Sequence, residues 1–408
     1  MPNAYKLSPK AALETLENRD FRWFWLGRLA SSATMEMGHV GEGWLVYTIT
    51  GSALAIGWVT AGSGLARILF SLWGGALADR LDKRKVLIYT RIFIVLKAVA
   101  LGLLVATDQV QIWHLVAYSL LSGISGSLMM PAQTAMLSHL VRPDQLMNAI
   151  SLNSVGQSLM GILGASLAGF AIDYLGVEAV YFTIAGLYLV ALYAVTRLPT
   201  VDVERAHKAS LWEDLREGVT YMRCTPSTLP LLGISLVRTL LGWAYRTLMP
   251  VYAREVMQMG GTGLGLLSAA PGAGSMVSSF LLAMLGNYKG KGRLLIGSGI
   301  LFGLALVAFA NVRWLPLVLL CLALAGMSRN IGMVTNQTLL QMNCDVAHRG
   351  RVMSMYMTIM GLNSLGTIPA GALADAFGVQ AAIMLYGGLM LLVYATLWLR
   401  RSPLRQME

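Results

Sequence analysis

The sequence predicts an all-α integral membrane protein with twelve transmembrane helices in two pseudo-symmetric six-helix bundles. Three observations lead to this prediction: the composition, the uneven distribution of positive charge, and an internal repeat. Of the 408 residues, 56% are hydrophobic and only 12% are charged, whereas about 25% of residues are charged in an ordinary soluble domain. A soluble chain of this length would need more polar surface than these residues supply.

Windows of about 20 residues locate the segments that are long and apolar enough to cross a bilayer. A polar stretch near the middle divides the chain into an N-terminal six-helix bundle (1–198), a cytoplasmic linker (199–228) and a C-terminal six-helix bundle (229–408). Apolar residues recur at helical spacing over 210–223, which predicts an amphipathic helix within the linker. The predicted spans are 22–47, 54–78, 86–106, 112–131, 148–172, 177–197, 229–252, 262–286, 293–311, 314–336, 352–374 and 379–399.

Positive charge is distributed unevenly between the two sets of loops. If both termini and every second loop lie in the cytoplasm, those segments hold 22 of the 31 Lys and Arg residues, counting Arg22, Arg197 and Arg293 at the cytoplasmic ends of spans. The opposite loops hold only Arg254 and Arg313. Cytoplasmic loops of membrane proteins carry such an excess. The net charge of +11 is therefore explained by membrane topology, and we expect the lipid bilayer rather than nucleic acid as the partner.

Two segments about half a chain apart resemble each other. Residues 168–179 read AGFAIDYLGVEA and residues 370–381 read AGALADAFGVQA, so the Ala-Gly, Asp, Gly-Val and final Ala positions coincide. Each segment connects the fifth and sixth predicted spans of its half. The basic turn after the second span also has a weaker counterpart at 285–293. These pairs predict parallel repeats related by an axis along the membrane normal.

That basic turn forms a short charged connection between the second and third predicted spans, on the cytoplasmic side. Its glycine and alanines allow close helix packing, and its charges can contact the end of a neighbouring helix. The run is Gly75-Ala-Leu-Ala-Asp79-Arg80-Leu-Asp82-Lys83-Arg84-Lys85.

The chain resembles the major facilitator superfamily from about residue 18 to residue 400. The basic run is similar to the cytoplasmic loop signature of that family, with Asp82 where glycine is usual. Three further segments are similar to the branch that contains the enterobactin exporter and macrolide-efflux-like proteins. They are Trp44-Leu-Val-Tyr-Thr-Ile-Thr-Gly51-Ser52-Ala, Pro131-Ala-Gln133 and Arg349-Gly350-Arg351-Val-Met-Ser354-Met-Tyr356.

The resemblance implies a monomeric transporter in a bacterial inner membrane, without a cofactor, in which two bundles rock about a central site. It also implies a cytoplasmic gate, in which Asp79 caps the eleventh span beside Arg351 while Arg84 pairs with Asp79. Gly75 and Arg80 belong to the same gate. The alternative is that these loop charges only set the membrane topology.

Polar residues of the first predicted span are the leading candidates for the central site. Ionisable groups in hydrocarbon cost about 2.5–3.5 kcal/mol each on insertion scales, so they require a partner or a function. Glu36, His39 and Glu42 follow at three-residue spacing and can share one pore-facing side. Glu36 is our first candidate for proton coupling, and the alternative is a structural salt bridge to a neighbouring helix. His39 is a candidate partner, and Glu42 lies nearer the outer surface.

Cations outnumber carboxylates among the deep polar residues, which indicates a substrate with an anionic group. Arg238 and Tyr245 are seven residues apart and share a face of the seventh span. The candidates for substrate binding or proton coupling on the other spans are Arg67, Arg329 and Asn330, and Lys97 and Arg246 are further cations within spans.

The sequence therefore predicts a proton-coupled exporter of an amphipathic, anionic small molecule, siderophore-like or drug-like. The alternatives are an importer or uniporter of a small metabolite, or a transporter in which Met35 and His39 bind a soft metal ion. We expect no resident metal and no enzyme activity, because the chain carries no set of nucleophile and base and no phosphate-binding loop.

Overall fold

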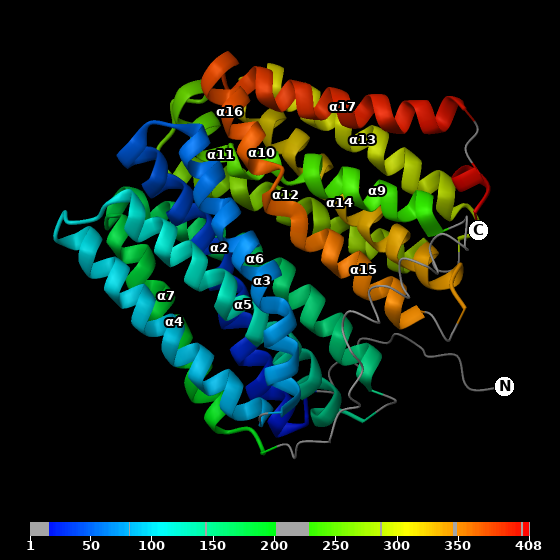
Figure 1. Cartoon of the computed structure of the whole chain (residues 1–408). Helices are drawn as coiled ribbons and strands as arrows, with labels where there is room; N and C mark the ends of the chain where they lie inside the picture. Colours follow the sequence, from blue (N-terminus) through cyan, green and yellow to red (C-terminus); the bar gives the residue numbers. More distant parts are fainter. Residues whose placement is uncertain are drawn as a thin grey trace.

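The computed structural model describes residues 16–80, 82–142, 145–200, 228–285, 288–345, 349–400 and 403–407. Every regular element in these ranges is helical, and none of them contains a strand (Figure 1). The amphipathic helix expected at 210–223 lies outside the described residues.

The elements are α2 (Arg19–Thr50), α3 (Ala53–Arg80), α4 (Lys83–Ala106), α5 (Ile112–Leu140), α6 (Leu146–Tyr174), α7 (Val177–Thr196), α9 (Thr228–Gly242), α10 (Ala244–Thr247), α11 (Met249–Val251), a π-helical segment (Tyr252–Val256), α12 (Gly261–Leu285), α13 (Lys291–Asn311), α14 (Leu315–Met342), α15 (Arg349–Gly361), a 3-10 turn (Leu362–Ser364), α16 (Thr367–Phe377), α17 (Val379–Leu399) and a final 3-10 turn (Pro403–Gln406).

Ten helical stretches among the described residues are long and apolar enough to cross a membrane. The predicted first span lies within α2, whose polar residues Glu36, His39 and Glu42 lower its hydropathy below that of the ten. The predicted eleventh span is divided between α15 and α16, and each part is shorter than a membrane-spanning helix.

The predicted seventh and eleventh spans are interrupted helices. In the seventh, α9 ends at Gly242, and Pro250 follows within the short helix α11. In the eleventh, Pro369 has no N–H to donate to the preceding turn. The Tyr386 hydroxyl of α17 donates to the carbonyl of Gly366, beside the break (3.0 Å). A side chain of a neighbouring helix thus bonds to the backbone where the helix is interrupted, which is how such breaks are tolerated in a membrane.

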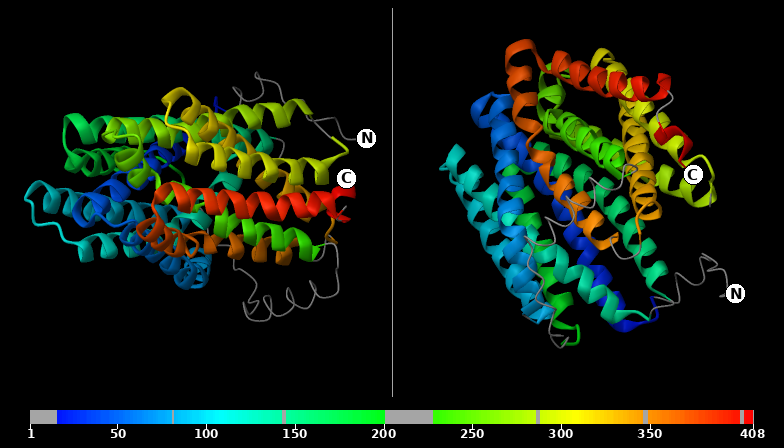
Figure 2. Two further views of the ribbon diagram at one scale, coloured as in Figure 1. Left: turned by 90° about the horizontal axis from the view of Figure 1, so that it is seen from above. Right: turned by 45° about the vertical axis from the view of Figure 1, so that its right-hand side comes forward.

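Helices α2 to α7 pack mainly on one another, and so do α9 and α12 to α17 (Figures 1 and 2). Two pairs form the main contacts between these sets: α6 lies against α12, and α3 lies against α16. Figure 1 shows the sets close together near α11 and α16 and diverging toward the opposite ends of the helices.

The two segments of the internal repeat adopt the same local structure. Gly176 and Gly378 separate α6 from α7 and α16 from α17, with φ of 89° and 87°. This left-handed region is costly for residues other than glycine. Seven residues before each of them, Gly169 lies against the backbone of α12 and Gly371 against that of α3. The repeat therefore places a glycine contact and a sharp turn at equivalent positions.

The aspartates of the repeat each cap a helix of the other set. Asp173 accepts hydrogen bonds from the backbone N–H groups of Gly261 (2.6 Å) and Thr262 (2.7 Å), at the start of α12. Asp375 accepts from the first two N–H groups of α3 (2.7 and 3.1 Å). Such groups have no partner within their own helix, and a carboxylate there also interacts favourably with the helix dipole. We call these contacts the paired caps, and the end of the molecule that contains them the capped end.

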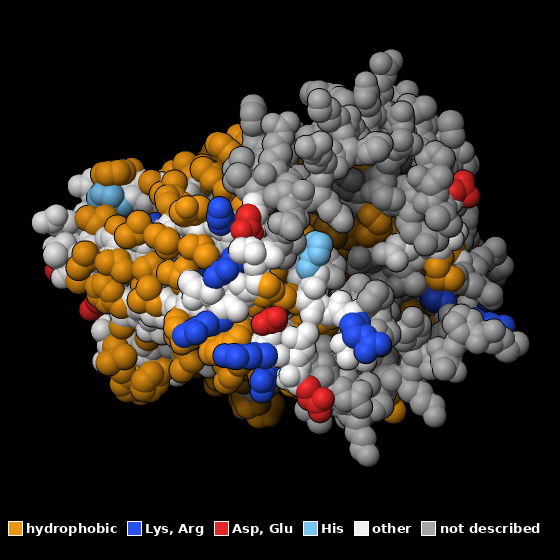
Figure 3. All heavy atoms as spheres, turned by 90° about the horizontal axis from the view of Figure 1, so that it is seen from below, with side chains coloured by type: hydrophobic (Ala, Val, Ile, Leu, Met, Phe, Trp, Pro, Cys, Tyr) orange, Lys and Arg blue, Asp and Glu red, His pale blue; other side chains and the backbone are white. Residues whose placement is uncertain are grey.

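A hydrophobic surface surrounds the helices. Large apolar side chains are exposed on many of them, including Trp58 (56%), Phe280 (68%) and Leu392 (63%). Figure 3 shows hydrophobic side chains covering one side of the face in view, with Lys and Arg side chains gathered beside them. Exposed apolar area of this extent is typical of a protein surrounded by lipid.

We expect Gly169→Ala to weaken the contact between α6 and α12. A Cβ at this position would lie 2.7 Å from the Cα of Gly265, and overpacking of this kind costs about 1–3 kcal/mol. The melting temperature of the purified protein should therefore fall. Gly186→Ala in α7 is the matched control, because no atom lies within 4 Å of its added Cβ. Equal melting temperatures for the two variants would contradict the close approach of these helices.

Candidate functional site

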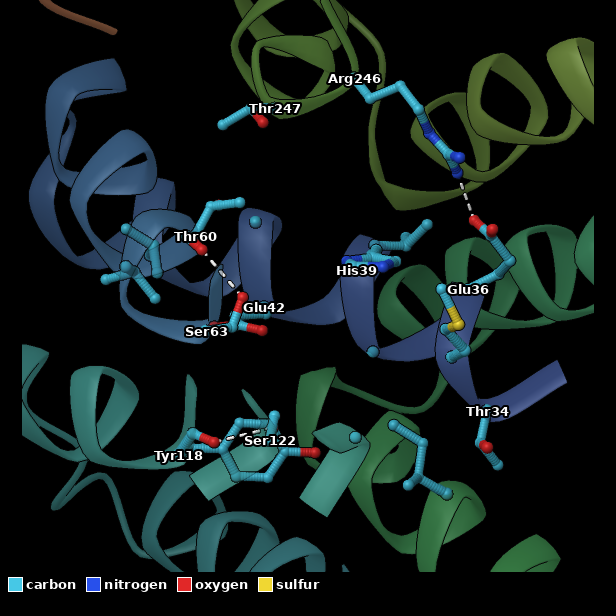
Figure 4. Close-up of a pocket in the computed structure, with 18 of the residues that line it drawn as sticks. Thr34, Glu36, His39, Glu42, Thr60, Ser63, Tyr118, Ser122, Arg246 and Thr247 are labelled. Atoms are coloured by element: carbon cyan, nitrogen blue, oxygen red, sulfur yellow. Dashed lines mark hydrogen bonds and ion pairs between the residues drawn. The ribbon is translucent and has the colours of Figure 1, made fainter. Parts of the chain in front are cut away.

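An ion pair joins the first long helix to the interrupted helix of the second set. The Arg246 side chain on α10 donates from Nη2 to Oε2 of Glu36 on α2 (Figure 4). The side chains are 18% and 19% exposed, respectively. Arg246 thus supplies the partner that a carboxylate in the middle of a membrane helix requires.

A first cavity of about 210 Å³ lies beside this pair. Glu36, His39 and Glu42 all line it, and Figure 4 shows His39 between the two carboxylates. Their spacing places them on one side of α2. Arg67 of α3 and Trp243, which follows α9, also line this cavity.

Glu42 lies in a second polar group within the first cavity. In the described part of the chain, its Oε1 atom is buried without a hydrogen-bond partner. Lys97 of α4 lies near enough to interact electrostatically with Glu42. Lys97 donates to the Ser122 hydroxyl, and its Nζ atom lies 4.2 Å from the centre of the Tyr118 ring. Glu42 is thus part of the cavity wall.

A second cavity of about 260 Å³ adjoins the first. Tyr245 and Arg329 line only the second, whereas Glu36, Arg246 and Ser268 line both. The ion pair therefore stands at the boundary between the two cavities.

Trp243 connects the charged groups at this boundary. The guanidinium carbons of Arg246 and Arg329 lie 4.9 and 4.7 Å from the centre of its ring. The His39 ring lies edge-on to it, with the ring centres 6.3 Å apart. An indole face attracts cations, so Trp243 stabilises both guanidinium groups although their charges repel each other. Trp243 and Arg246, which both follow the break after α9, therefore both line the first cavity.

Two sequence candidates, Arg238 and Asn330, line neither cavity. Arg238 donates to the carbonyl oxygen of Arg329 (2.6 Å). The Asn330 side chain donates to α12, to the hydroxyls of Ser278 and Ser279 (each 2.9 Å). Both residues therefore connect neighbouring helices of the second set.

The predicted gate lies largely beyond the described side chains. Gly75, Asp79 and Arg80 belong to the last turns of α3, and Arg351 to the first turn of α15, but their side chains are outside the described part of the chain. Arg84 is described, and its Nη2 donates to the carbonyl of Thr196 (2.5 Å). The contact of Asp79 with the eleventh span stays a prediction.

Sequence reasoning did not select Arg246, Trp243, Lys97 or Tyr118 as site residues. The signal for Arg246 was its cost in a membrane helix, which requires a partner of opposite charge. For Trp243, the signal was the adjacent Gly242 together with Pro250, because interrupted membrane helices often form binding sites. For Lys97, the sequence offered no sign that α4 faces the cavity.

Membrane-length helices that enclose polar cavities beside an ion pair are typical of a multi-pass membrane transporter. A model of the transmembrane secretion effector family matches residues 10–408, and the chain belongs to this family of the major facilitator superfamily. The function is thus transport and not enzymatic catalysis.

Curated relatives include transporters of siderophores and drugs. The staphyloferrin A transporter of Staphylococcus aureus is 26% identical, over 86% of this chain and 88% of its own length. Macrolide efflux protein A of Streptococcus pyogenes is 22% identical, over 91% and 94%. The enterobactin exporter of Escherichia coli is 24% identical, over 94% of both chains. The branch that the sequence motifs indicated is therefore confirmed.

Solved transporters share the fold at low sequence identity. A nucleoside transporter superposes with a TM-score of 0.77 at 11% identity, over 94% of this chain and 99% of that one. A D-xylose–proton symporter superposes with a TM-score of 0.71 at 14% identity, over 94% and 97%. These likenesses confirm the helical transporter fold.

Proposed function

We propose that this chain is an alternating-access transporter that exports an amphipathic, anionic small molecule, siderophore-like or drug-like, driven by proton entry. The observation that carries the proposal is the ion pair of Glu36 and Arg246 at the boundary of the two cavities. The exporters among the relatives support the direction of transport.

The ion pair provides a mechanism for exchange. In the empty protein it joins α2 to α10 and holds the two sets of helices together. Either a proton on Glu36 or an anionic group beside Arg246 releases this connection, because each removes the attraction between the two side chains. The empty protein therefore keeps its conformation, whereas the protein that carries either a proton or the anionic substrate can change it. Exchange of protons for substrate requires this difference.

The proposed architecture is twelve spans in two six-helix bundles, 1–198 and 229–408, joined by the linker 199–228. The protein is a monomer in a bacterial inner membrane with both termini in the cytoplasm. Since α2 begins and α17 ends away from the capped end, this orientation places the paired caps outside. The predicted cytoplasmic gate of Gly75, Asp79, Arg80, Arg84 and Arg351 then closes the opposite end in the alternate state.

Inverted membrane vesicles with an acidic interior test the proposal. Vesicles that contain the protein should accumulate labelled compounds from a panel of siderophores and drugs, and a protonophore should abolish the accumulation. Vesicles without the protein are the control. Accumulation only in right-side-out vesicles would indicate import instead, and accumulation that survives the protonophore would contradict proton coupling.

A further inference from the structure

Arg329 is a cation on the wall of the second cavity, and no described carboxylate forms an ion pair with it. Among the described residues, Glu36 is the carboxylate that lines this cavity, and Arg246 already occupies it. No described residue accepts a hydrogen bond from the Arg329 guanidinium, and its central carbon lies 4.7 Å from the centre of the Trp243 ring. A charge so far inside a membrane protein calls for a counter-charge. Among the described residues, the carboxylate that acts on Arg329 is Glu36, which already forms an ion pair with Arg246.

The position of Arg329 is fixed by its neighbours. Its carbonyl oxygen accepts a hydrogen bond from Arg238 (2.6 Å), which anchors this turn of α14 to α9. Trp243 holds the guanidinium from one face. An arginine that is already oriented loses less conformational freedom when it binds a ligand.

The rest of the second cavity suits an anionic group. Gly161, Gly272 and Gly326 line it without a side chain. Gln157 and Tyr245 add an amide and a phenol that can donate hydrogen bonds. The volume of about 260 Å³ is less than the roughly 300–1,000 Å³ of a drug-sized pocket. The cavity is therefore sized for one part of a larger molecule.

We propose that Arg329 binds a carboxylate or similar oxyanion of the substrate in the second cavity, while the remainder of the substrate occupies the first. This inference rests on the proposed function, and it names the group that the site recognises. A guanidinium binds a carboxylate through two parallel hydrogen bonds. The bound anion lies next to Arg246, where it competes with Glu36, and the aromatic rings of Trp243 and Tyr245 favour an aromatic or otherwise flat neighbouring group.

Benzoate is a suitable probe because it combines a carboxylate with an aromatic ring, and benzamide is its neutral counterpart of the same shape. The experiment measures the melting temperature of the purified protein over a range of probe concentrations. Stabilisation by mass action then gives an apparent Kd. We expect benzoate to stabilise the protein and benzamide not to do so.

Substitutions assign the effect to Arg329. We expect Arg329→Gln to weaken benzoate binding at least about tenfold, since a charge-assisted bidentate contact is lost. Arg329→Lys keeps the charge, so it should retain part of the binding and show that the site still folds. Arg313→Gln is the control for net charge, because Arg313 is exposed in the turn between α13 and α14.

Three results would overturn the proposal: no stabilisation of the unaltered protein by benzoate, equal stabilisation by benzamide, or unchanged benzoate binding in Arg329→Gln. Because the experiment measures binding without a proton gradient, its outcome is independent of the vesicle assay. A protein that binds benzoate through Arg329 but shows no proton-driven export would contradict the coupling mechanism and leave the anion site standing.

Discussion

Glu36→Gln is expected to abolish accumulation driven by the pH gradient while downhill transport continues. Glutamine cannot take up or release a proton, and it removes the charge that holds Arg246 in place. The connection between α2 and α10 is then weak in the empty protein as well. The variant should therefore let substrate equilibrate across vesicle membranes without responding to the gradient.

Loss of stability has to be separated from loss of coupling. Removing one partner of a buried ion pair costs about 3–5 kcal/mol, so Glu36→Gln should also lower the melting temperature. The double variant Glu36→Gln with Arg246→Gln removes both charges and should regain much of the stability but not the coupling. Glu178→Gln, in the first turn of α7 and away from both cavities, is the control. Gradient-driven accumulation at the normal level in Glu36→Gln would show that the pair is only structural.

Replacing both aspartates of the paired caps by alanine is expected to open the capped end. Loss of a helix cap costs about 0.5–2 kcal/mol, so the two together destabilise the closed arrangement by about 1–4 kcal/mol. That range corresponds to about fivefold to several hundredfold in the conformational equilibrium. The conformational equilibrium shifts because the caps join α6 to α12 and α16 to α3, and these contacts hold the capped end closed.

Labelling of a cavity residue measures this equilibrium. Thr60 of α3 lines the first cavity, so Thr60→Cys in a background without the native cysteines reports access from outside by a membrane-impermeant maleimide. We expect much faster labelling in the Asp173→Ala, Asp375→Ala protein. The Asp173→Asn, Asp375→Asn protein is the matched control, because asparagine caps helices about as well as aspartate. Faster labelling in both proteins, or in neither, would be inconsistent with capping as the cause.

Patterns within a single helix predicted much of this molecule. The helical spans follow from runs of apolar residues, and the common side of Glu36, His39 and Glu42 follows from the period of the α-helix. The repeat at 168–179 and 370–381 predicted equivalent positions in the two halves. Gly176 and Gly378 then adopt nearly the same left-handed backbone conformation.

Contacts between helices could not be predicted from patterns in the sequence. Arg246 and Glu36 are 210 residues apart, and nothing in either segment identifies the other as its partner. Arg238 and Arg329 both lie within predicted spans, yet of the two only Arg329 lines a cavity. The difference depends on how each helix is rotated about its axis, which the packing of neighbouring helices determines. Breaks at Gly242 and Pro250 change that rotation again partway along the seventh span.

The paired caps make each half of the chain complementary to a copy of itself. The first half carries an acid in Asp173 and a helix start at Ala53, and the second half carries the same two parts in Asp375 and Gly261. Two identical half-length chains would therefore present the matching surfaces of an isologous dimer. If the chain arose by duplication and fusion of such a half-length protein, both hydrogen-bonding arrangements were already present in the ancestral dimer.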